Sequence, residues 1–230
     1  MKNILPIVVL LLALVGCQET KTNNTRLELI PDPEENPDLT DAQSIAYNNG
    51  LAHWNKVSEL RFTFNVDRGG KHYERSWRWK PKTDDVTLIS ENDTVTYNRK
   101  EMDSLIMKTD AGFVNDSYWL LAPYKLVWDQ GTTLSKTTTA IAPISKDTLN
   151  KLTITYGNKG GYTPGDAYDF YFDTNFRVKE WIFRKGNDST PSMMTTWEDY
   201  KDYNGLTLSK MHQDSTGGFK LYFTDISVKK

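Results

Sequence analysis

The sequence predicts a mainly β protein of the α+β class, in which antiparallel strands form the sheet and a few helices pack against it. About ten segments alternate apolar and polar residues with a period of two, the spacing of a strand with one buried face. Short turns rich in Gly, Asn and Asp join most of these segments, which favours an antiparallel meander over a parallel sheet. Two stretches, 39–60 and 100–129, carry apolar residues at helical spacing instead.

The first sixteen residues have the features of a secretory signal peptide. Lys2 precedes an unbroken run of twelve apolar or proline positions, Ile4 to Val15, and the small residue Gly16 follows. A helix needs about 20 apolar residues to cross a bilayer core, so this run is too short to be a membrane span. We therefore expect residues 1–16 to be an export signal.

The only cysteine of the chain, Cys17, follows this run directly. The sequence "LVGC" that it completes resembles the lipobox of bacterial lipoproteins. The resemblance implies a diacylglyceryl group on the Cys17 thiol, cleavage before Cys17 and acylation of the new amine. The alternative is a buried or chance cysteine beside an unrelated signal. Lipidation predicts a membrane anchor, because each buried methylene contributes about 0.8 kcal/mol.

Residues 17–38 are polar and acidic with three prolines, which predicts a lipidated N-terminus and a flexible tether. Residues 39–230 then form one predicted domain, since they contain neither an internal repeat nor a second linker. A single cysteine permits no intrachain disulfide, so the domain must be stabilised by its packed core.

The domain is predicted to open with a helix that is broken near Gly50. Thr40 and Gln43 have the spacing of a capping box, and Ala42 and Ile45 begin an apolar stripe. The strand segments that follow are, in chain order, "ELRFTFNV", "KHYERSWRW", "DVTLIS", "TVTYN", "LTITYG", "DAYDFYFDT", "FRVKEWIFRKG", "MMTTWEDY", "LTLSKM" and "FKLYFTDISV".

Residues 100–129 interrupt the strands. Met102, Leu105 and Ile106 are helically spaced, and the apolar cluster 118–121 is expected to stop at Pro123. This cluster is too apolar for a surface loop, so we expect the stretch to pack over the sheet as a lid.

The sequence predicts no enzyme, no metal site and no cofactor. It lacks the common nucleophile, zinc and phosphate-binding motifs, and His53, His72 and His212 lie far apart. Its 30 acidic residues outnumber the 28 basic ones, which argues against nucleic acid as a partner.

Aromatic residues make up 12% of the chain, with seven Trp and twelve Tyr, and they suggest two interpretations. In one, the rings simply fill a core between sheet and helix. In the other, a curved sheet closed by helices leaves a hydrophobic pocket on its concave face. The candidate pocket residues, assigned by alternation, are Leu60, Phe62, Phe64, Trp77, Trp79, Trp119, Leu120, Leu121, Phe170 and Phe172.

The order of elements, together with the late "YFD", "WEDY" and "TDI" segments, resembles the Lol-type (LolA/LolB-like) lipoprotein carriers and receptors. The "NDSYWLLAPYKL" block and "RSWRWKP" resemble more closely an uncharacterised lipoprotein family of Bacteroidota. The resemblance implies a curved antiparallel half-barrel of about eleven strands, with an N-terminal helix and a mid-chain helical lid over the concave face.

These expectations define a membrane-anchored envelope lipoprotein that binds or carries a lipid or lipoprotein acyl chain. The alternative is a structural or interaction lipoprotein with a filled core and no ligand. Gln18 stands where Asp favours inner-membrane retention, and the residues after Cys17 include only Glu19 as an acidic residue before Lys21. We therefore expect the outer membrane, on the side that faces the periplasm. The anchor is the expected membrane contact, and no protein partner is implied.

Overall fold

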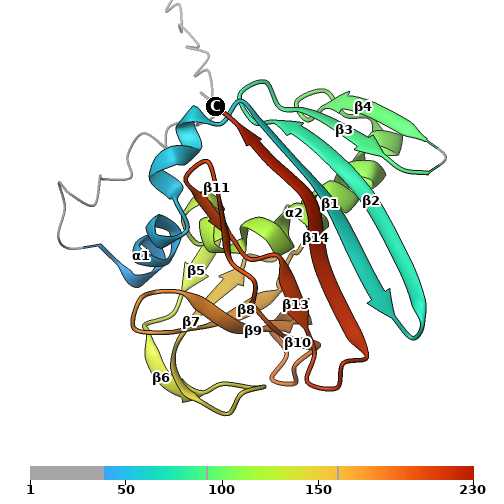
Figure 1. The fold of residues 1–230 in the computed structure, drawn as a ribbon. Coiled ribbons are helices and arrows are strands. Elements are labelled where there is room, and N and C mark those ends of the chain that lie inside the picture. Colours follow the sequence, from blue (N-terminus) through green and yellow to red (C-terminus); the bar gives the residue numbers. More distant parts are fainter. Residues whose placement is uncertain (1–38, 92, 160) are drawn as a thin grey trace, which may run out of the picture. The chain divides into compact units, whose positions relative to one another are not determined.

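Two open antiparallel sheets and one long helix make up most of the structure, a computed structural model that describes residues 39–91, 93–159 and 161–230 (Figure 1). The signal peptide, Cys17 and the tether lie outside the described residues. The first sheet has the order β13-β14-β1-β2-β3-β4, and the second β10-β9-β8-β7-β5 with β6 also paired to β7. The strands are β1 (Glu59–Arg68), β2 (Lys71–Lys80), β3 (Asp85–Ile89), β4 (Thr94–Asn98), β5 (Thr132–Leu134), β6 (Thr138–Ile141), β7 (Thr148–Tyr156), β8 (Ala167–Phe172), β9 (Val178–Arg184), β10 (Met193–Thr196), β11 (Lys201–Tyr203), β12 (Leu206–Leu208), β13 (Met211–Gln213) and β14 (Phe219–Lys229).

The helix predicted at the start of the domain is present and is broken where expected. The Thr40 side chain caps α1 (Asp41–Asn48) in a capping box with Gln43. Gly50 then adopts φ +92, and a Cβ at this position would lie 1.9 Å from the Gly205 carbonyl oxygen. Only glycine fits this close approach in the left-handed conformation. The chain continues as the 3-10 helix η1 (Leu51–Lys56).

The mid-chain stretch forms one helix, α2 (Ser104–Trp128), which the side chain of Asp103 caps. The prediction that its apolar cluster stops at Pro123 was wrong, since the helix continues past this residue. A proline inside a helix costs about 3 kcal/mol, because it removes one backbone hydrogen bond and crowds the preceding turn. Burial of residues 118–124 with Leu126 and Val127 offsets that cost, and the Tyr124 hydroxyl also donates to the Asn49 carbonyl.

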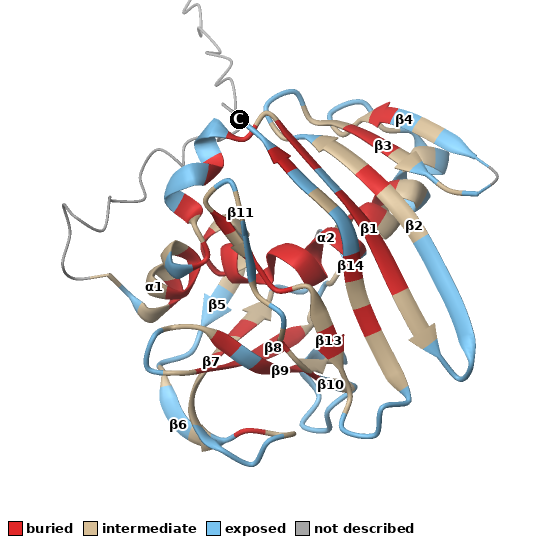
Figure 2. Ribbon diagram, viewed as in Figure 1, coloured by how far each residue is buried: buried red, intermediate tan, exposed pale blue. Residues whose placement is uncertain are grey.

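The first sheet begins with the predicted hairpin. In its register Leu60 lies opposite Trp79 and Phe62 opposite Trp77, so these four side chains share one face of the sheet. α2 runs behind this sheet from the β3–β4 side towards α1 (Figure 1). Buried residues gather on α2 and in the middle of the strands, whereas the hairpin ends are exposed (Figure 2).

All six residues of β8, in the second sheet, are buried. Phe170 and Trp181 face each other across the β8–β9 pair on one side of the sheet. On the other side Tyr171 packs with Ile182 and with Ala142, which follows β6. Because side chains pack against both faces of the sheet at β8, no position of this strand is exposed.

The predicted fold class is confirmed: the chain is mainly β, with few helices and with antiparallel sheets that do not close into a barrel. The ten predicted strand segments are all present, and the four strands that the pattern missed are β5, β6, β11 and β13, each of three or four residues. The two sheets approach each other where Glu198 pairs with Met211 and the Gln213 amide donates to Thr196 Oγ1. Among the described residues, no helix has the length and apolar character needed to cross a bilayer.

Candidate functional site

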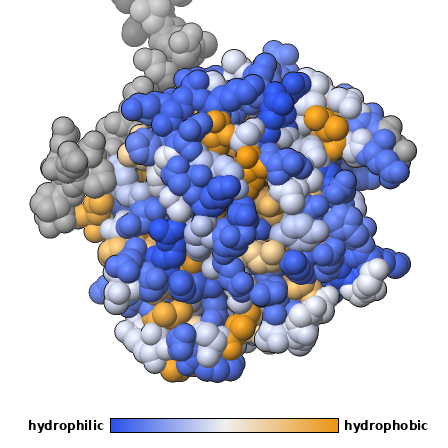
Figure 3. Space-filling model, viewed as in Figure 1, coloured by the Kyte–Doolittle hydropathy of each residue, from blue (hydrophilic) through white to orange (hydrophobic). Residues whose placement is uncertain are grey.

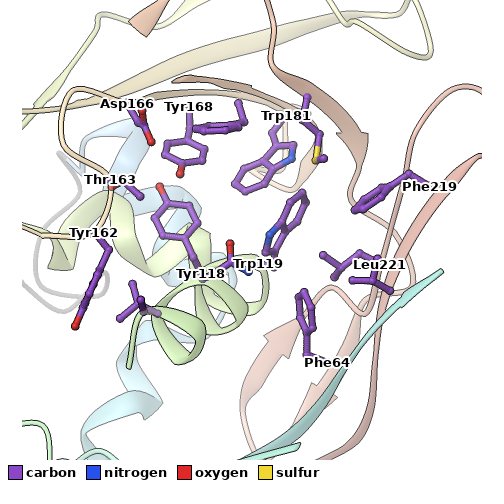
Figure 4. Close-up of a pocket in the computed structure, with 16 residues that line it drawn as sticks. Phe64, Tyr118, Trp119, Tyr162, Thr163, Asp166, Tyr168, Trp181, Phe219 and Leu221 are labelled. Carbon is purple, nitrogen blue, oxygen red and sulfur yellow. The ribbon is translucent and has the colours of Figure 1, made fainter. Parts of the chain in front are cut away.

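A cavity of about 510 Å³ lies between α2 and the two sheets. We call it the aromatic cavity (Figure 4). Its lining residues are Phe64, Val66, Ala111, Val114, Asn115, Tyr118, Trp119, Tyr162, Thr163, Asp166, Tyr168, Trp181, Phe183, Met193, Phe219 and Leu221.

One stripe of α2 forms the floor of this cavity. Ala111, Val114, Asn115, Tyr118 and Trp119 follow one another at steps of three and one, which places them on a single face of a helix. The remaining walls come from β1 and β14 of the first sheet, from β8, β9 and β10 of the second, and from the loop before β8.

Aromatic pairs build the wall towards the second sheet. The Tyr118 and Tyr168 rings stack with centroids 4.7 Å apart, and Trp119 meets Trp181 edge to face at 4.5 Å. Such pairs contribute about 0.5–1.5 kcal/mol beyond the burial of their area. The apolar surface is thus gathered inside the molecule, while the face in Figure 3 is mainly hydrophilic with small separate hydrophobic areas.

The cavity has a polar end, where Tyr162, Thr163 and Asp166 lie opposite Phe64 and Leu221 (Figure 4). The Tyr162 hydroxyl donates to Asp110 Oδ2 at 2.9 Å. This hydrogen bond ties the loop before β8 to α2.

The polar end of the cavity extends to two neighbouring tyrosine hydroxyls, those of Tyr118 and Tyr156. The Tyr156 hydroxyl donates to Asp129 Oδ2 at 2.7 Å and lies 3.0 Å from the Tyr118 hydroxyl. Burial raises the pKa of Tyr118 well above its usual value, so this group is neutral.

Two fully buried carboxylates pin α2 to the first sheet. Asp116 accepts from Arg75 Nε at 2.5 Å, from Arg75 Nη2 at 2.6 Å and from Trp77 Nε1 at 2.7 Å. Asp110 accepts from Arg99 Nε at 2.8 Å. Burial opposes the charge of Arg75, but the hydrogen bonds and charge of Asp116 outweigh it and raise the pKa of Arg75.

The sequence matches no protein-family model and no curated protein. Among solved structures it is similar to a LolA superfamily protein from Nitrosomonas europaea, with a TM-score of 0.50 and 11% identity over 84% of this chain and 95% of that one. This chain has a LolA-like fold. A further match is a DUF1329 family protein from Desulfovibrio piger, with a TM-score of 0.43 and 9% identity over 82% of this chain and 92% of that one. Another is a putative outer membrane lipoprotein-sorting protein domain from Vibrio parahaemolyticus, with a TM-score of 0.46 and 10% identity over 83% of this chain and 91% of that one.

The Lol-type resemblance drawn from the sequence is therefore confirmed at the level of the fold, whereas the resemblance to a Bacteroidota family stays a prediction. In the LolA-like fold of this chain, Phe64 and Trp119 line the aromatic cavity. Trp79 is half-buried, and its ring centroid lies 5.3 Å from that of Trp54 and 5.5 Å from that of Phe113. The candidates buried outside the aromatic cavity are Leu60, Phe62, Trp77, Leu120, Leu121, Phe170 and Phe172.

Alternation did not identify the remaining lining residues. Tyr168 and Trp181 share their strand faces with Phe170, so the sheet pattern holds no signal that separates them from the core behind. Asp110 and Asp116 were missed too, although two acids among the apolar residues of one helix are a signal for buried ion pairs. The lipid contacts of the ten candidate residues stay a prediction.

His212 packs behind the cavity wall, with its ring centroid 5.4 Å from that of Trp119 and 4.4 Å from that of Trp197. Complete burial lowers its pKa to about 3, so the imidazole is neutral. No group of three or more His, Cys, Asp or Glu side chains among the described residues is arranged to hold a metal ion.

Proposed function

We propose that this chain is an envelope lipoprotein that binds a lipid or lipoprotein acyl chain in the aromatic cavity of its LolA-like domain. The observation that carries the proposal is the cavity itself. Its volume of about 510 Å³ lies within the range of about 300–1,000 Å³ typical of small-molecule sites. Its walls are mainly rings and aliphatic side chains. No catalytic role is proposed.

An acyl chain suits these walls because it offers only apolar surface. Each methylene removed from water contributes about 0.8 kcal/mol. The ion pairs of Asp110 and Asp116 hold the floor of the cavity in place before binding, which reduces the ordering cost.

The test uses the full chain with Cys17→Ser, which removes the proposed lipid and leaves every described residue unchanged. We expect this chain to bind a fluorescent fatty acid. Ala111→Trp places a ring in the cavity, so it should weaken binding at least about tenfold without lowering the melting temperature. Ala52→Trp, at an exposed position on η1, is the matched control and should bind normally.

A filled-core module without a ligand is the competing function. Its support is the complete burial of Leu60, Phe62, Phe170 and Phe172, none of which is more than 1% exposed. Absence of fatty-acid binding by the parent chain, together with unfolding of Ala111→Trp, would favour this module.

The anchor and location belong to the same proposal. We place the lipid on Cys17 and the protein in the outer membrane, facing the periplasm. The parent should remain with membranes after a carbonate wash, whereas Cys17→Ser should be released. Membrane retention of Cys17→Ser would mean another anchor, and removal of the protein by protease on intact cells would mean a surface location.

A further inference from the structure

A second cavity, of about 370 Å³, adjoins the polar end of the aromatic cavity. We call it the polar cavity and define it by Arg99, Lys125, Asp129, Gln130, Tyr156 and Lys159. The two cavities share Val114, Tyr118, Tyr162 and Thr163 as lining residues. The aromatic cavity and the polar cavity are therefore neighbours that share one wall.

The charges around the polar cavity are unequal. Arg99 is matched by Asp110 at 2.8 Å and Lys125 by Asp129 at 3.3 Å. Lys159 also lines the cavity, is exposed and forms no ion pair with a described residue. One positive charge is thus left over among the residues that line the polar cavity. The Asp166 carboxylate, at the polar end of the aromatic cavity, does not line the polar cavity and accepts a hydrogen bond from the Gly186 backbone amide at 2.7 Å.

Lys125 can contribute to the same preference, because its ion pair is easily exchanged. The Asp129 carboxylate that it contacts also accepts from the Tyr156 hydroxyl, so this acid keeps a hydrogen bond when the lysine turns away. The side chain of Lys125 is partly exposed, so a ligand can reach its amine.

We infer that the ligand is an amphipathic lipid with an anionic headgroup, a carboxylate or a phosphate, whose chain fills the aromatic cavity and whose headgroup lies in the polar cavity beside Lys125 and Lys159. This inference rests on the proposed function. A neutral headgroup would gain nothing from the unpaired cation, while an anionic one would. Exposed ion pairs are weak, so the preference is modest.

The experiment compares four palmitoyl lipids as competitors of a bound fluorescent fatty acid on the Cys17→Ser chain. They are palmitate, methyl palmitate, lysophosphatidylglycerol and lysophosphatidylcholine. We expect each anionic lipid to compete about threefold to tenfold better than its uncharged or zwitterionic counterpart, and less so at high salt. The stronger of the two anionic lipids identifies carboxylate or phosphate as the preferred group.

Two variants test the assigned residues: the single variant Lys159→Gln and the double variant that adds Lys125→Gln. The matched control is Lys56→Gln, at an exposed position outside both cavities. The double variant should lose the anionic preference while its affinity for methyl palmitate stays unchanged. Lys56→Gln should keep the preference.

Equal competition by palmitate and methyl palmitate on the parent would overturn the headgroup site and leave acyl binding intact. Retention of the full preference by the double variant would also overturn it. If no palmitoyl lipid competes and the fluorescent fatty acid itself fails to bind, the proposed function fails as well.

Discussion

Truncation of Trp119 separates a cavity wall from a filled core. Trp119 lines the aromatic cavity, is 9% exposed and contacts Trp181 at 4.5 Å. Phe170 is 0% exposed, lies outside the cavity lining and contacts the same Trp181 ring at 6.0 Å. The two positions thus differ mainly in whether empty space already lies beside the ring.

The expected costs differ for this reason. Phe170→Ala leaves a new void in the core and should lower the free energy of unfolding by about 3–5 kcal/mol. Trp119→Ala adds its space to an existing cavity, so the cost is mainly the lost ring pair and part of the lost burial. We expect about 2 kcal/mol, or about 4–8 °C in melting temperature for a domain of 150–250 residues.

Thermal melts and fatty-acid titration on the two variants provide the measurement. Trp119→Ala should weaken fatty-acid binding about fivefold to tenfold, because one wall of the site is removed. Phe170→Ala, if it remains folded at the assay temperature, should bind within about twofold of the parent. A melting temperature of Trp119→Ala as low as that of Phe170→Ala, with unchanged binding, would refute the reasoning.

Two further predictions concern buried charge. Asp116→Asn should lower the free energy of unfolding by about 3 kcal/mol, because the partly buried Arg75 loses its carboxylate partner. Arg75→Met with Asp116→Leu should recover most of that loss. Urea unfolding of the single and double variants is the measurement, and a loss below about 1 kcal/mol for Asp116→Asn would contradict the prediction. The pKa of His212 is about 3 when folded and near 6.5 when unfolded, so its stabilisation is complete above pH 6.5 and falls by about 1.4 kcal/mol per unit as the pH drops towards 3. His212→Phe should flatten the acid slope between pH 6.5 and 4.5, whereas His72→Gln, which removes an exposed histidine with a raised pKa, should not.

Local patterns predicted those parts of the fold that local physics determines. The capping box at Thr40, the break at Gly50 and the long hairpins each follow from a few neighbouring residues, and all are present. The short strands β5, β6, β11 and β13 have too few residues to show a period, so pairing with distant strands defines them. The passage of α2 through Pro123 likewise depends on burial that no local pattern reveals.

The site was harder to predict for a related reason. The alternation of apolar and polar residues shows which face of a strand is shielded from water. It does not distinguish a face packed against a helix from a face that lines a cavity. Phe64 and Phe62 lie on the same face of β1, and only Phe64 reaches the cavity, because α2 crosses the sheet at an angle that depends on the whole domain. The partners of the buried acids on α2 are equally distant, since Arg75 is 41 residues from Asp116.

The two sides of α2 differ in how readily they can separate, which bears on how a ligand enters. Towards the first sheet, lifting the helix would break the ion pairs of Asp110 and Asp116, and each break costs about 3–5 kcal/mol as long as the carboxylate stays out of water. Towards the second sheet, Tyr118 and Trp119 meet Trp181 through ring contacts of about 0.5–1.5 kcal/mol each, and the Tyr156 and Tyr162 hydroxyls donate to Asp129 and Asp110. An acyl chain can replace the apolar surface lost when those rings part, but it cannot replace a carboxylate. The ion pairs argue against the mid-chain segment as a lid that moves away from the whole sheet. Parting Trp119 from Trp181 alone costs less than breaking either ion pair, and it opens the side of the aromatic cavity on which Trp181 lies.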